Sequence, residues 1–78
     1  MISIGFGNFV NEQRVVAVVS PETAPIKRLI QSAKEEGVLI DVTFGRKTRS
    51  VIILDSKQVV ICPLQTETLI QRFDIKKY

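Results

Sequence analysis

Three cations crowd one short turn of this 78-residue chain, which reads Gly-Arg-Lys-Thr-Arg over residues 45–49. This basic turn lies between two apolar runs, so it is expected to join two strands. Like charges held this close repel one another, and an anionic partner would relieve the repulsion. Phosphate is the anion whose geometry best matches the two-point fork of an arginine side chain. We therefore predict that Arg46, Lys47 and Arg49 bind nucleic-acid phosphate.

Four more cations are candidates for the same surface. Arg14 opens an apolar strand that we expect to end near the basic turn, where it would add another phosphate contact. Lys27 and Lys34 recur at helical spacing on one side of a predicted helix, and Arg28 follows Lys27. Most basic helix faces contact only water, and two neighbouring glutamates weaken the field, so these three are the weaker candidates.

Aromatic residues are few. Phe44 stands directly beside the basic turn, and we predict that it is the one ring placed to stack on a base. Phe6 lies at strand spacing and Phe73 at helical spacing, so both are expected in the hydrophobic core.

Catalysis and metal binding are not indicated. The chain has no histidine, so acid–base chemistry would fall to lysines or to eight scattered acidic residues. Asp41, near the basic turn, is expected to be a solvated or structural residue, although it could also orient Arg46 or Arg49. The single cysteine, Cys62, can form neither an internal disulfide nor a structural zinc site, and we expect it to be buried in a strand. We predict no enzyme activity, no cofactor and no metal.

The hydrophobic pattern predicts a single α+β domain over residues 1–78. Apolar runs indicate a mainly antiparallel sheet of about five strands, at residues 2–6, 14–19, 38–43, 50–54 and 59–62. Asn8 is expected to turn the chain between the first two strands.

Two helices should accompany this sheet. Apolar residues recurring every three or four positions predict a main helix, with Thr23 as its N-cap, Pro25 in its first turn and Gly37 after its end. A short C-terminal helix is expected with Thr66 as its cap. Residues 73–78 should form a frayed tail, with Phe73 still on the apolar side of the helix.

Three of the predicted strands are apolar at nearly every position, so both faces of the sheet need to be buried. The main helix can cover one face, but the C-terminal helix is too short to cover the other. An uncovered apolar face usually marks an interface, so we predict a homo-oligomer. The longest apolar run has five residues, so no membrane span is expected, and the lone cysteine fits the cytoplasm.

Three segments, in order, resemble the RemA-type extracellular matrix regulators of bacteria. They are the Ile-Gly-Phe-Gly-Asn segment at residues 4–8, the Val-Ser-Pro-Glu-Thr-Ala-Pro-Ile-Lys-Arg segment at 19–28, and the basic turn followed by Val-Ile-Ile at 51–53 and Asp-Ser at 55–56. The resemblance runs from about Ile2 to Phe73 and so covers nearly the whole chain.

The resemblance implies a DNA-binding transcriptional regulator that promotes biofilm matrix genes. It implies a closed ring of identical subunits, an octamer, that presents arginines from many subunits to double-stranded DNA. The family's functional arginines fall on Arg14 and Arg46. The next position, usually arginine, is Lys47 here, which keeps the charge but loses the two-point fork. The family's helix proline matches Pro25, to which we assign a structural role.

Two other functions remain open from the residues alone. One is a small RNA-binding ring, which an exposed Phe44 on the binding face would favour. The other is a structural or protein-interaction scaffold whose basic turn meets an acidic partner. Competition between duplex DNA and single-stranded RNA would separate the RNA-binding ring from a DNA-binding regulator. Failure to bind any nucleic acid at low salt would favour the scaffold.

Overall fold

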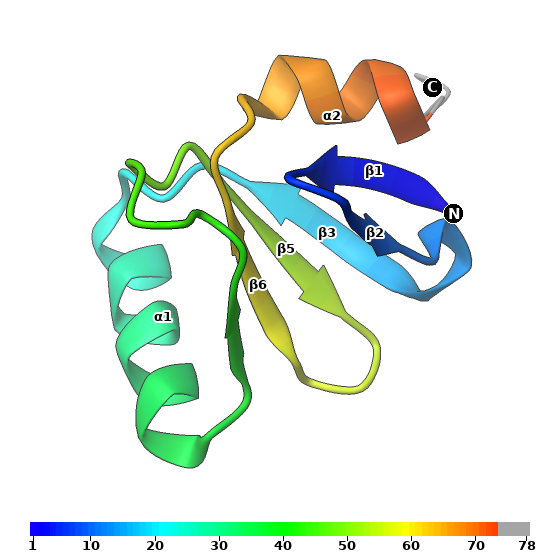
Figure 1. The fold of residues 1–78 in the computed structure, drawn as a ribbon. Coiled ribbons are helices and arrows are strands. Elements are labelled where there is room, and N and C mark those ends of the chain that lie inside the picture. Colours follow the sequence, from blue (N-terminus) through cyan, green and yellow to red (C-terminus); the bar gives the residue numbers. More distant parts are fainter. Residues whose placement is uncertain (74–78) are drawn as a thin grey trace.

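The structure, a computed structural model, describes residues 1–73 as a small α+β domain with two α-helices and two sheets (Figure 1). The strands are β1 (Ile2–Gly5), β2 (Asn8–Val10), β3 (Val15–Val19), β4 (Leu39–Asp41), β5 (Ser50–Leu54) and β6 (Val59–Cys62). The helices are the 3-10 turn η1 (Glu12–Arg14), α1 (Ala24–Glu36) and α2 (Thr66–Phe73). The predicted frayed tail lies outside the described residues, except for Phe73, which ends α2.

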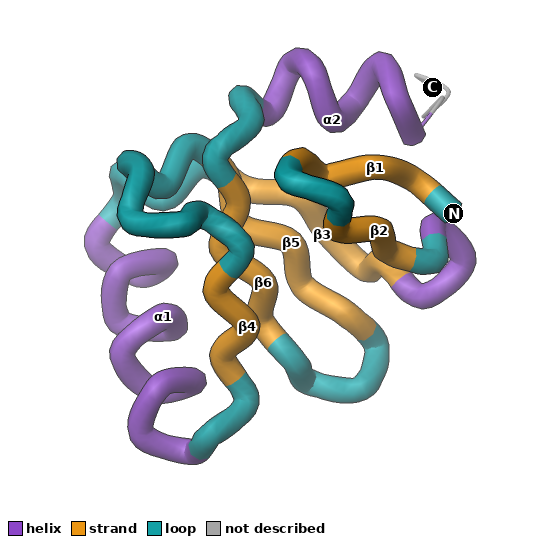
Figure 2. The backbone as a smooth tube through the Cα atoms, in the orientation of Figure 1, coloured by secondary structure: helices purple, strands orange, loops and turns teal. Residues whose placement is uncertain are grey.

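The larger sheet has the strand order β3-β5-β6-β4, and β1 and β2 form a separate hairpin (Figure 2). β5 is antiparallel to both of its neighbours, whereas β4 runs parallel to β6. The larger sheet is mainly antiparallel, as predicted, and the parallel edge strand is compatible with that prediction. The prediction of a single sheet of about five strands is wrong, because the first strand lies outside the larger sheet, in the hairpin. A local hydrophobic pattern marks a strand but not its partner, because pairing joins residues far apart in the chain.

Two strands match their predicted bounds, β3 and β4 are shorter than predicted, and the β1–β2 region differs. β5 and β6 are uninterrupted runs of small or apolar residues and lie where predicted. β1 ends earlier than predicted, because Phe6 lies in a turn rather than in the strand. That turn leads into β2, where Asn8 begins a strand instead of turning the chain. Phe6 and Gly7 have φ of 52° and 77°, the combination that a two-residue type I′ hairpin turn requires.

The signals for the main helix are confirmed. Thr23 holds the N-cap position of α1, Pro25 lies in its first turn, and Gly37 ends it with a φ of 75°. The Gly37 amide donates to the carbonyl of Ala33, which closes the last turn in the left-handed manner that glycine favours. α2 includes Thr66 as its first residue rather than having it as a preceding cap.

Side chains alternate across β6 and so build a core on each side of the larger sheet. Val59 and Ile61 pack with Ala33 of α1 on one face. Val60 and Cys62 pack with residues of the β1–β2 hairpin and of α2 on the other (Figure 1). Cys62 is fully buried, which confirms its predicted place in a strand.

The face opposite α1 is only partly covered. The β1–β2 hairpin packs against part of it, a cover that the hydrophobic pattern does not indicate. A groove of about 470 Å³ remains, lined by apolar residues that include Val42, Leu54 and Val60. Phe9 and Ile40 line the same groove and stay exposed. An apolar surface is thus left open, although it is smaller than predicted.

Candidate nucleic-acid interface

The basic turn belongs to a longer loop, residues 42–49, which we call the basic loop. It connects β4 to β5, and these strands are not neighbours, because β6 lies between them. Both ends of the loop are attached to β6. The Val42 amide donates to the Ile61 carbonyl at 3.1 Å, and the Arg49 amide donates to the Cys62 carbonyl at 2.9 Å. The loop is therefore anchored at both ends while its middle projects from the domain.

Asp41 fixes the first part of this loop. Its Oδ1 accepts hydrogen bonds from the Thr43 amide at 2.8 Å and from Thr43 Oγ1 at 2.6 Å, and Thr43 is buried. These two bonds favour the ionised carboxylate and lower the pKa of Asp41 below its usual 3.8. Asp41 is thus a structural residue, one of the two roles expected for it.

A tight turn then presents the cations. The Arg46 amide donates to the Thr43 carbonyl at 3.0 Å, and the residues between them, Phe44 and Gly45, have φ of 53° and 78°. Arg46 and Lys47 are exposed, as is Arg49 at the end of the loop. Within residues 1–73 none of the three forms an ion pair. No carboxylate among the described residues neutralises their charge, which leaves it available to an anion from outside the domain.

One of the helix cations joins this surface. Lys27, in the first turns of α1, lines a polar cavity of about 680 Å³ together with Lys47 and Arg49. The same cavity also contains Glu22 and Glu67, so its net positive charge is small. Lys27 therefore extends the basic surface only modestly.

The other two helix cations are less involved. Arg28 is exposed on α1 but does not line that cavity. Lys34 lies seven residues beyond Lys27, which is roughly 10 Å further along the helix. It sits in the last turn, away from the basic loop (Figure 1).

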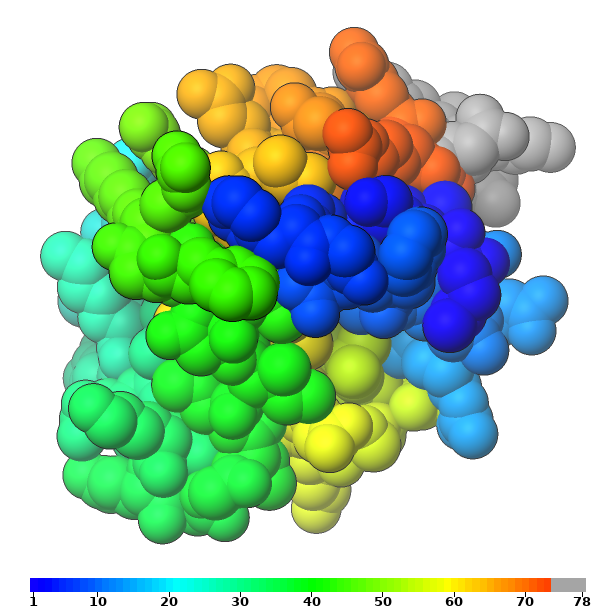
Figure 3. Space-filling model, in the orientation of Figure 1, coloured from blue at the N-terminus to red at the C-terminus, as the bar shows by residue number. Residues whose placement is uncertain are grey.

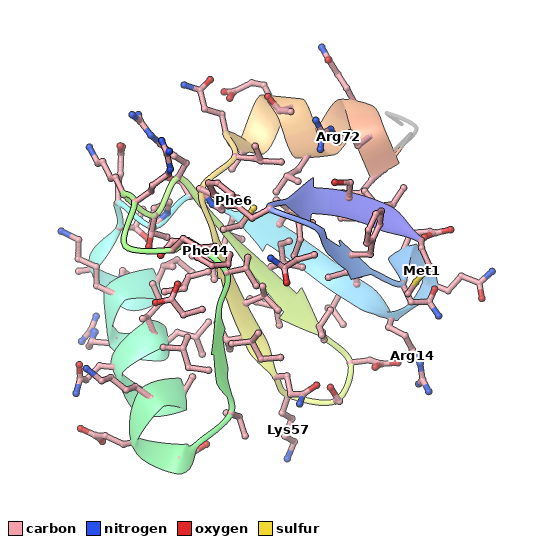
Figure 4. All side chains as sticks on the ribbon, viewed as in Figure 1. Met1, Phe6, Arg14, Phe44, Lys57 and Arg72 are labelled. Carbon is pink, nitrogen blue, oxygen red and sulfur yellow. The ribbon has the colours of Figure 1, made fainter. Side chains whose placement is uncertain are left out.

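Arg14 lies at the wrong end of its strand for the predicted arrangement. β3 pairs antiparallel with β5, so Val15 is opposite Leu54, and it is Val19 that lies opposite Val51 beside the basic loop. Four residues of strand separate the two ends, roughly 13 Å. Arg14 Nη1 instead donates to Asp55 Oδ2 at 3.1 Å (Figure 4). β3 therefore ends beside the basic loop, as expected, but Arg14 stands at its start and does not join the three loop cations of the same subunit.

Two of the three aromatic residues lie where predicted, and Phe6 does not. Phe44 is 73% exposed beside the cations, as its predicted role requires. Phe6 is 50% exposed, so its assignment to the core is wrong, whereas Phe73 packs against the core. The rings of Phe6 and Phe44 lie 5.1 Å apart, and Figure 3 shows the hairpin tip in blue against the basic loop in green. A Phe-Gly dipeptide occurs at both positions, a repeated signal that marks Phe6 as a turn residue.

Other kinds of site are not found in the described part of the chain. Residues 1–73 contain no group of three or more potential metal-ligating side chains. None of their helices has the length and apolar character needed to cross a membrane.

Comparison with known proteins places the chain in a family. The family described as Extracellular matrix regulatory protein A-like, or RemA-like, matches residues 1–73. A protein of Finegoldia magna is 64% identical over 73 residues, which cover 94% of this chain and 88% of that protein. A protein of Gloeothece citriformis is 57% identical over 77 residues, 99% of this chain and 88% of that protein. A protein of Bacillus pumilus is 51% identical over 77 residues, which cover 99% of this chain and 86% of that protein.

All three relatives carry the description "putative regulatory protein". The family match spans the three segments on which the predicted resemblance depends and therefore confirms it. The chain belongs to the RemA-like family of bacterial regulatory proteins.

Proposed function

We propose that the protein is a transcription regulator, not an enzyme, and that it binds duplex DNA through the basic loop. The observation that supports this most directly is that Arg46, Lys47 and Arg49 are exposed and unpaired within residues 1–73, on a loop anchored to β6 at both ends. Cations on an ordered backbone lose less conformational freedom when they bind phosphate. The family description points to extracellular matrix genes, and hence biofilm formation, as what is regulated.

A ring of identical subunits, an octamer in our proposal, makes these contacts strong enough. One subunit offers about three phosphate contacts from the basic loop, or four with Arg14. That number suffices only for weak binding. Holding copies in a fixed circle raises the effective concentration of each further contact, and avidity can gain roughly 10²–10⁴-fold. Bending duplex along the ring costs on the order of 1–6 kcal/mol, which many cationic contacts offset.

Two free sheet edges support such an assembly. β3 and β4 are the outermost strands on opposite edges of the larger sheet, so each leaves one side without a strand partner among the described residues. A closed ring needs contact between two different surfaces of neighbouring subunits, and the two edges are such a pair. Val16 on β3 and Ile40 on β4 add exposed apolar side chains to them. We place the ring in the cytoplasm, where the free Cys62 stays reduced.

Arg14 acts in this proposal as a separate contact. Because it lies at the far end of β3, it meets the DNA backbone at a different point from the basic loop of the same subunit. In a head-to-tail ring, the β3 edge of one subunit would lie beside the next subunit, so contacts from both regions repeat around the circle.

Binding of a short labelled duplex over a series of salt concentrations tests the proposal. The logarithm of the affinity should fall linearly with the logarithm of the salt concentration, as counterion release requires. Arg46→Ala should weaken binding and reduce the slope by about one for each phosphate contact removed. Lys57→Ala is the matched control, because Lys57 is an exposed cation in the β5–β6 turn, far from the basic loop (Figure 4).

Molar mass in solution, with and without duplex, tests the ring. Wild type and Arg46→Ala should both have the mass of a closed oligomer. A flat salt response contradicts phosphate contact, and an oligomer that dissociates on Arg46→Ala makes Arg46 an interface residue. A stable monomer that binds duplex tightly contradicts the ring.

A small RNA-binding ring is the second candidate, and one observation favours it. Phe44 is largely exposed directly beside the cations, as a base-stacking residue on a single-strand surface would be. A single-stranded RNA that displaces duplex DNA at equal nucleotide concentration would favour this function over the first. Failure of both nucleic acids to bind at low salt would favour a scaffold with an acidic partner.

A further inference from the structure

Two turns of the chain share an unusual sequence and an unusual backbone conformation. Phe6-Gly7 forms the tip of the β1–β2 hairpin, and Phe44-Gly45 forms the turn inside the basic loop. The φ angle is 52° at Phe6 and 53° at Phe44. Bulky side chains rarely adopt this left-handed conformation, which glycine, asparagine and aspartate adopt at lower cost. The turns alone therefore do not explain the two phenylalanines.

The two rings meet, although they come from segments far apart in the sequence. Their centroids are 5.1 Å apart, within the range of favourable aromatic pairs, and their planes are tilted by 59°. The Arg46 guanidinium lies 5.3 Å from the centroid of the Phe6 ring. Phe6 is thus in contact with both Phe44 and Arg46, and Phe44 is the more exposed of the two rings. Figure 4 shows the two phenylalanines side by side.

Burial does not explain this cluster either. Phe44 keeps 73% of its surface exposed, so its contact with Phe6 removes little apolar area from water. The nearby carboxylate of Asp41 is bonded to Thr43, within the loop. What the cluster presents outward is therefore an apolar ring beside the three cations of the basic loop, which form no ion pair with any residue from 1 to 73.

A partner that satisfies both features has closely spaced negative charges beside flat apolar surfaces, and duplex DNA is such a partner. Proteins that bend DNA commonly insert an apolar side chain between base steps, held in place by cations on the adjacent phosphates. Phe44 is two residues from Arg46, so a loop that binds phosphates at the rim of a groove brings the ring against the bases.

We propose that Phe44 is an apolar wedge that inserts at a base step of bound duplex, and that Phe6 is the positioning residue that holds its ring outward. This inference rests on duplex binding by the basic loop, as proposed above. It adds a source of sequence preference, because flexible pyrimidine–purine steps unstack more easily than other steps. Repeated around a ring, the wedges would also kink the duplex at regular intervals.

The test uses duplexes that carry the fluorescent base 2-aminopurine at successive positions, including TA steps. Its fluorescence rises when the base unstacks, so wild-type protein should raise it at some positions and not at others. Phe44→Ala should abolish the rise and weaken binding about 5- to 150-fold, the range measured for base–aromatic contacts. The salt slope should stay unchanged, because no phosphate contact is lost. Ile70→Ala, which shortens a partly exposed apolar side chain on α2, is the control. It should change neither the fluorescence rise nor the duplex affinity.

Two more variants separate a wedge from other roles. Phe44→Leu should keep most of the fluorescence rise, because leucine also serves as a wedge, whereas a stacking role requires an aromatic ring. Phe44→Asn should melt no lower than wild type, because asparagine suits the positive φ, and it should still lose the fluorescence rise. Phe6→Ala should reduce the rise without abolishing it.

Each contrary result has a definite meaning. Salt-dependent duplex binding with no fluorescence rise at any position overturns the wedge and leaves the proposed function standing. No duplex binding at all overturns both. Equal loss with leucine and alanine, or a preference for single-stranded RNA, assigns Phe44 to stacking instead. A large drop in melting temperature with Phe44→Asn makes the Phe6–Phe44 pair a structural clasp between the hairpin and the loop.

Discussion

Arginine occurs in two contrasting settings at the two ends of β5. At one end, Arg46 and Arg49 stand on the basic loop, with no carboxylate partner among residues 1–73. At the other end, Arg14 pairs with Asp55 at 3.1 Å (Figure 4). Both side chains of that pair are exposed, so the pair adds little to stability, yet it reduces the charge that Arg14 offers to a ligand. Counting cations alone does not separate these two settings, whereas the anchored backbone of the loop and the absence of ion pairs there among residues 1–73 do.

Removing both loop arginines is the strongest test of this contrast. The double variant Arg46→Ala/Arg49→Ala should lose on the order of 100-fold or more in duplex affinity, since each charged hydrogen bond contributes about 1.5–3 kcal/mol. The free energy of unfolding should change by less than about 0.5 kcal/mol, because both side chains are exposed. Titration of a labelled duplex and denaturant unfolding measure the two quantities.

Arg14→Ala/Lys57→Ala is the charge-matched control for that variant. It removes two cations from the other end of the molecule and should cost far less affinity. If the two double variants lost the same affinity, only net charge would matter, and the contrast between the two ends would be false.

Several features of the basic loop can be predicted from the sequence alone. Its three cations, the adjoining β5 and the exposed Phe44 are all predictable, because each follows from a run of neighbouring residues. The main helix is predictable for the same reason, since Thr23, Pro25 and Gly37 are local signals of its two ends.

The parts that could not be predicted depend on partners distant in the sequence. Whether Arg14 lies near the basic loop depends on the direction in which β3 pairs with β5, which no local pattern specifies. The parallel pairing of β4 with β6 and the contact of Phe6 with Phe44 join separate segments in the same way. The core position predicted for Phe6 fails because alternation of apolar residues continues into a tight turn.

The anchoring of the loop can be tested at Asp41. Asp41→Ala removes the oxygen that accepts both Thr43 hydrogen bonds and should lower the free energy of unfolding by about 1–2 kcal/mol. Asp41→Asn keeps a carbonyl oxygen in the same place and should cost less. Hydrogen exchange at the Thr43 amide should become faster in Asp41→Ala, because that amide loses its acceptor. Unchanged exchange would show that the hydrogen bonds to β6 alone order the loop.

Acid should have a related effect. The pKa of Asp41 is lowered in the folded protein, so its contribution to stability is fully present above its unfolded value near 3.8 and is lost as pH falls through the folded value. The difference in unfolding free energy between wild type and Asp41→Ala should therefore shrink below about pH 4. A difference that stays constant as the pH falls further would mean that the ionised carboxylate is not what holds Thr43.

Lys47→Arg should strengthen duplex binding by the basic loop and so widen its difference from the Arg14 end of β5. Lysine presents a point charge, whereas arginine binds phosphate through two parallel hydrogen bonds. We expect duplex affinity to rise by about 3- to 10-fold, roughly the value of one extra hydrogen bond, with an unchanged salt slope. Lys57→Arg is the control and should leave affinity unchanged. No gain would indicate that position 47 contacts phosphate through charge alone, or that it does not contact DNA.

The smallest effect is expected at the Arg14–Asp55 pair. Asp55→Asn removes the carboxylate charge and so makes the whole charge of Arg14 available to DNA. Exposed ion pairs are worth about 0.2–1 kcal/mol, so affinity should rise by about 1.5- to 5-fold, most clearly at low salt. Arg14→Ala should lower affinity by a similar factor.

A double-mutant cycle then shows whether the affinity gained in Asp55→Asn comes from its ion pair with Arg14. If Asp55 acts by pairing with Arg14, Asp55→Asn should have little effect once residue 14 is alanine, because the two substitutions share one interaction. A gain that persists in the double variant would instead come from the lower negative charge of the whole surface. If Arg14→Ala alone cost as much affinity as the loop double variant, DNA phosphate would have to replace Asp55 completely as the partner of Arg14. The two ends of β5 would then be equivalent binding regions, and the ion pair would be only the unbound resting state of the second.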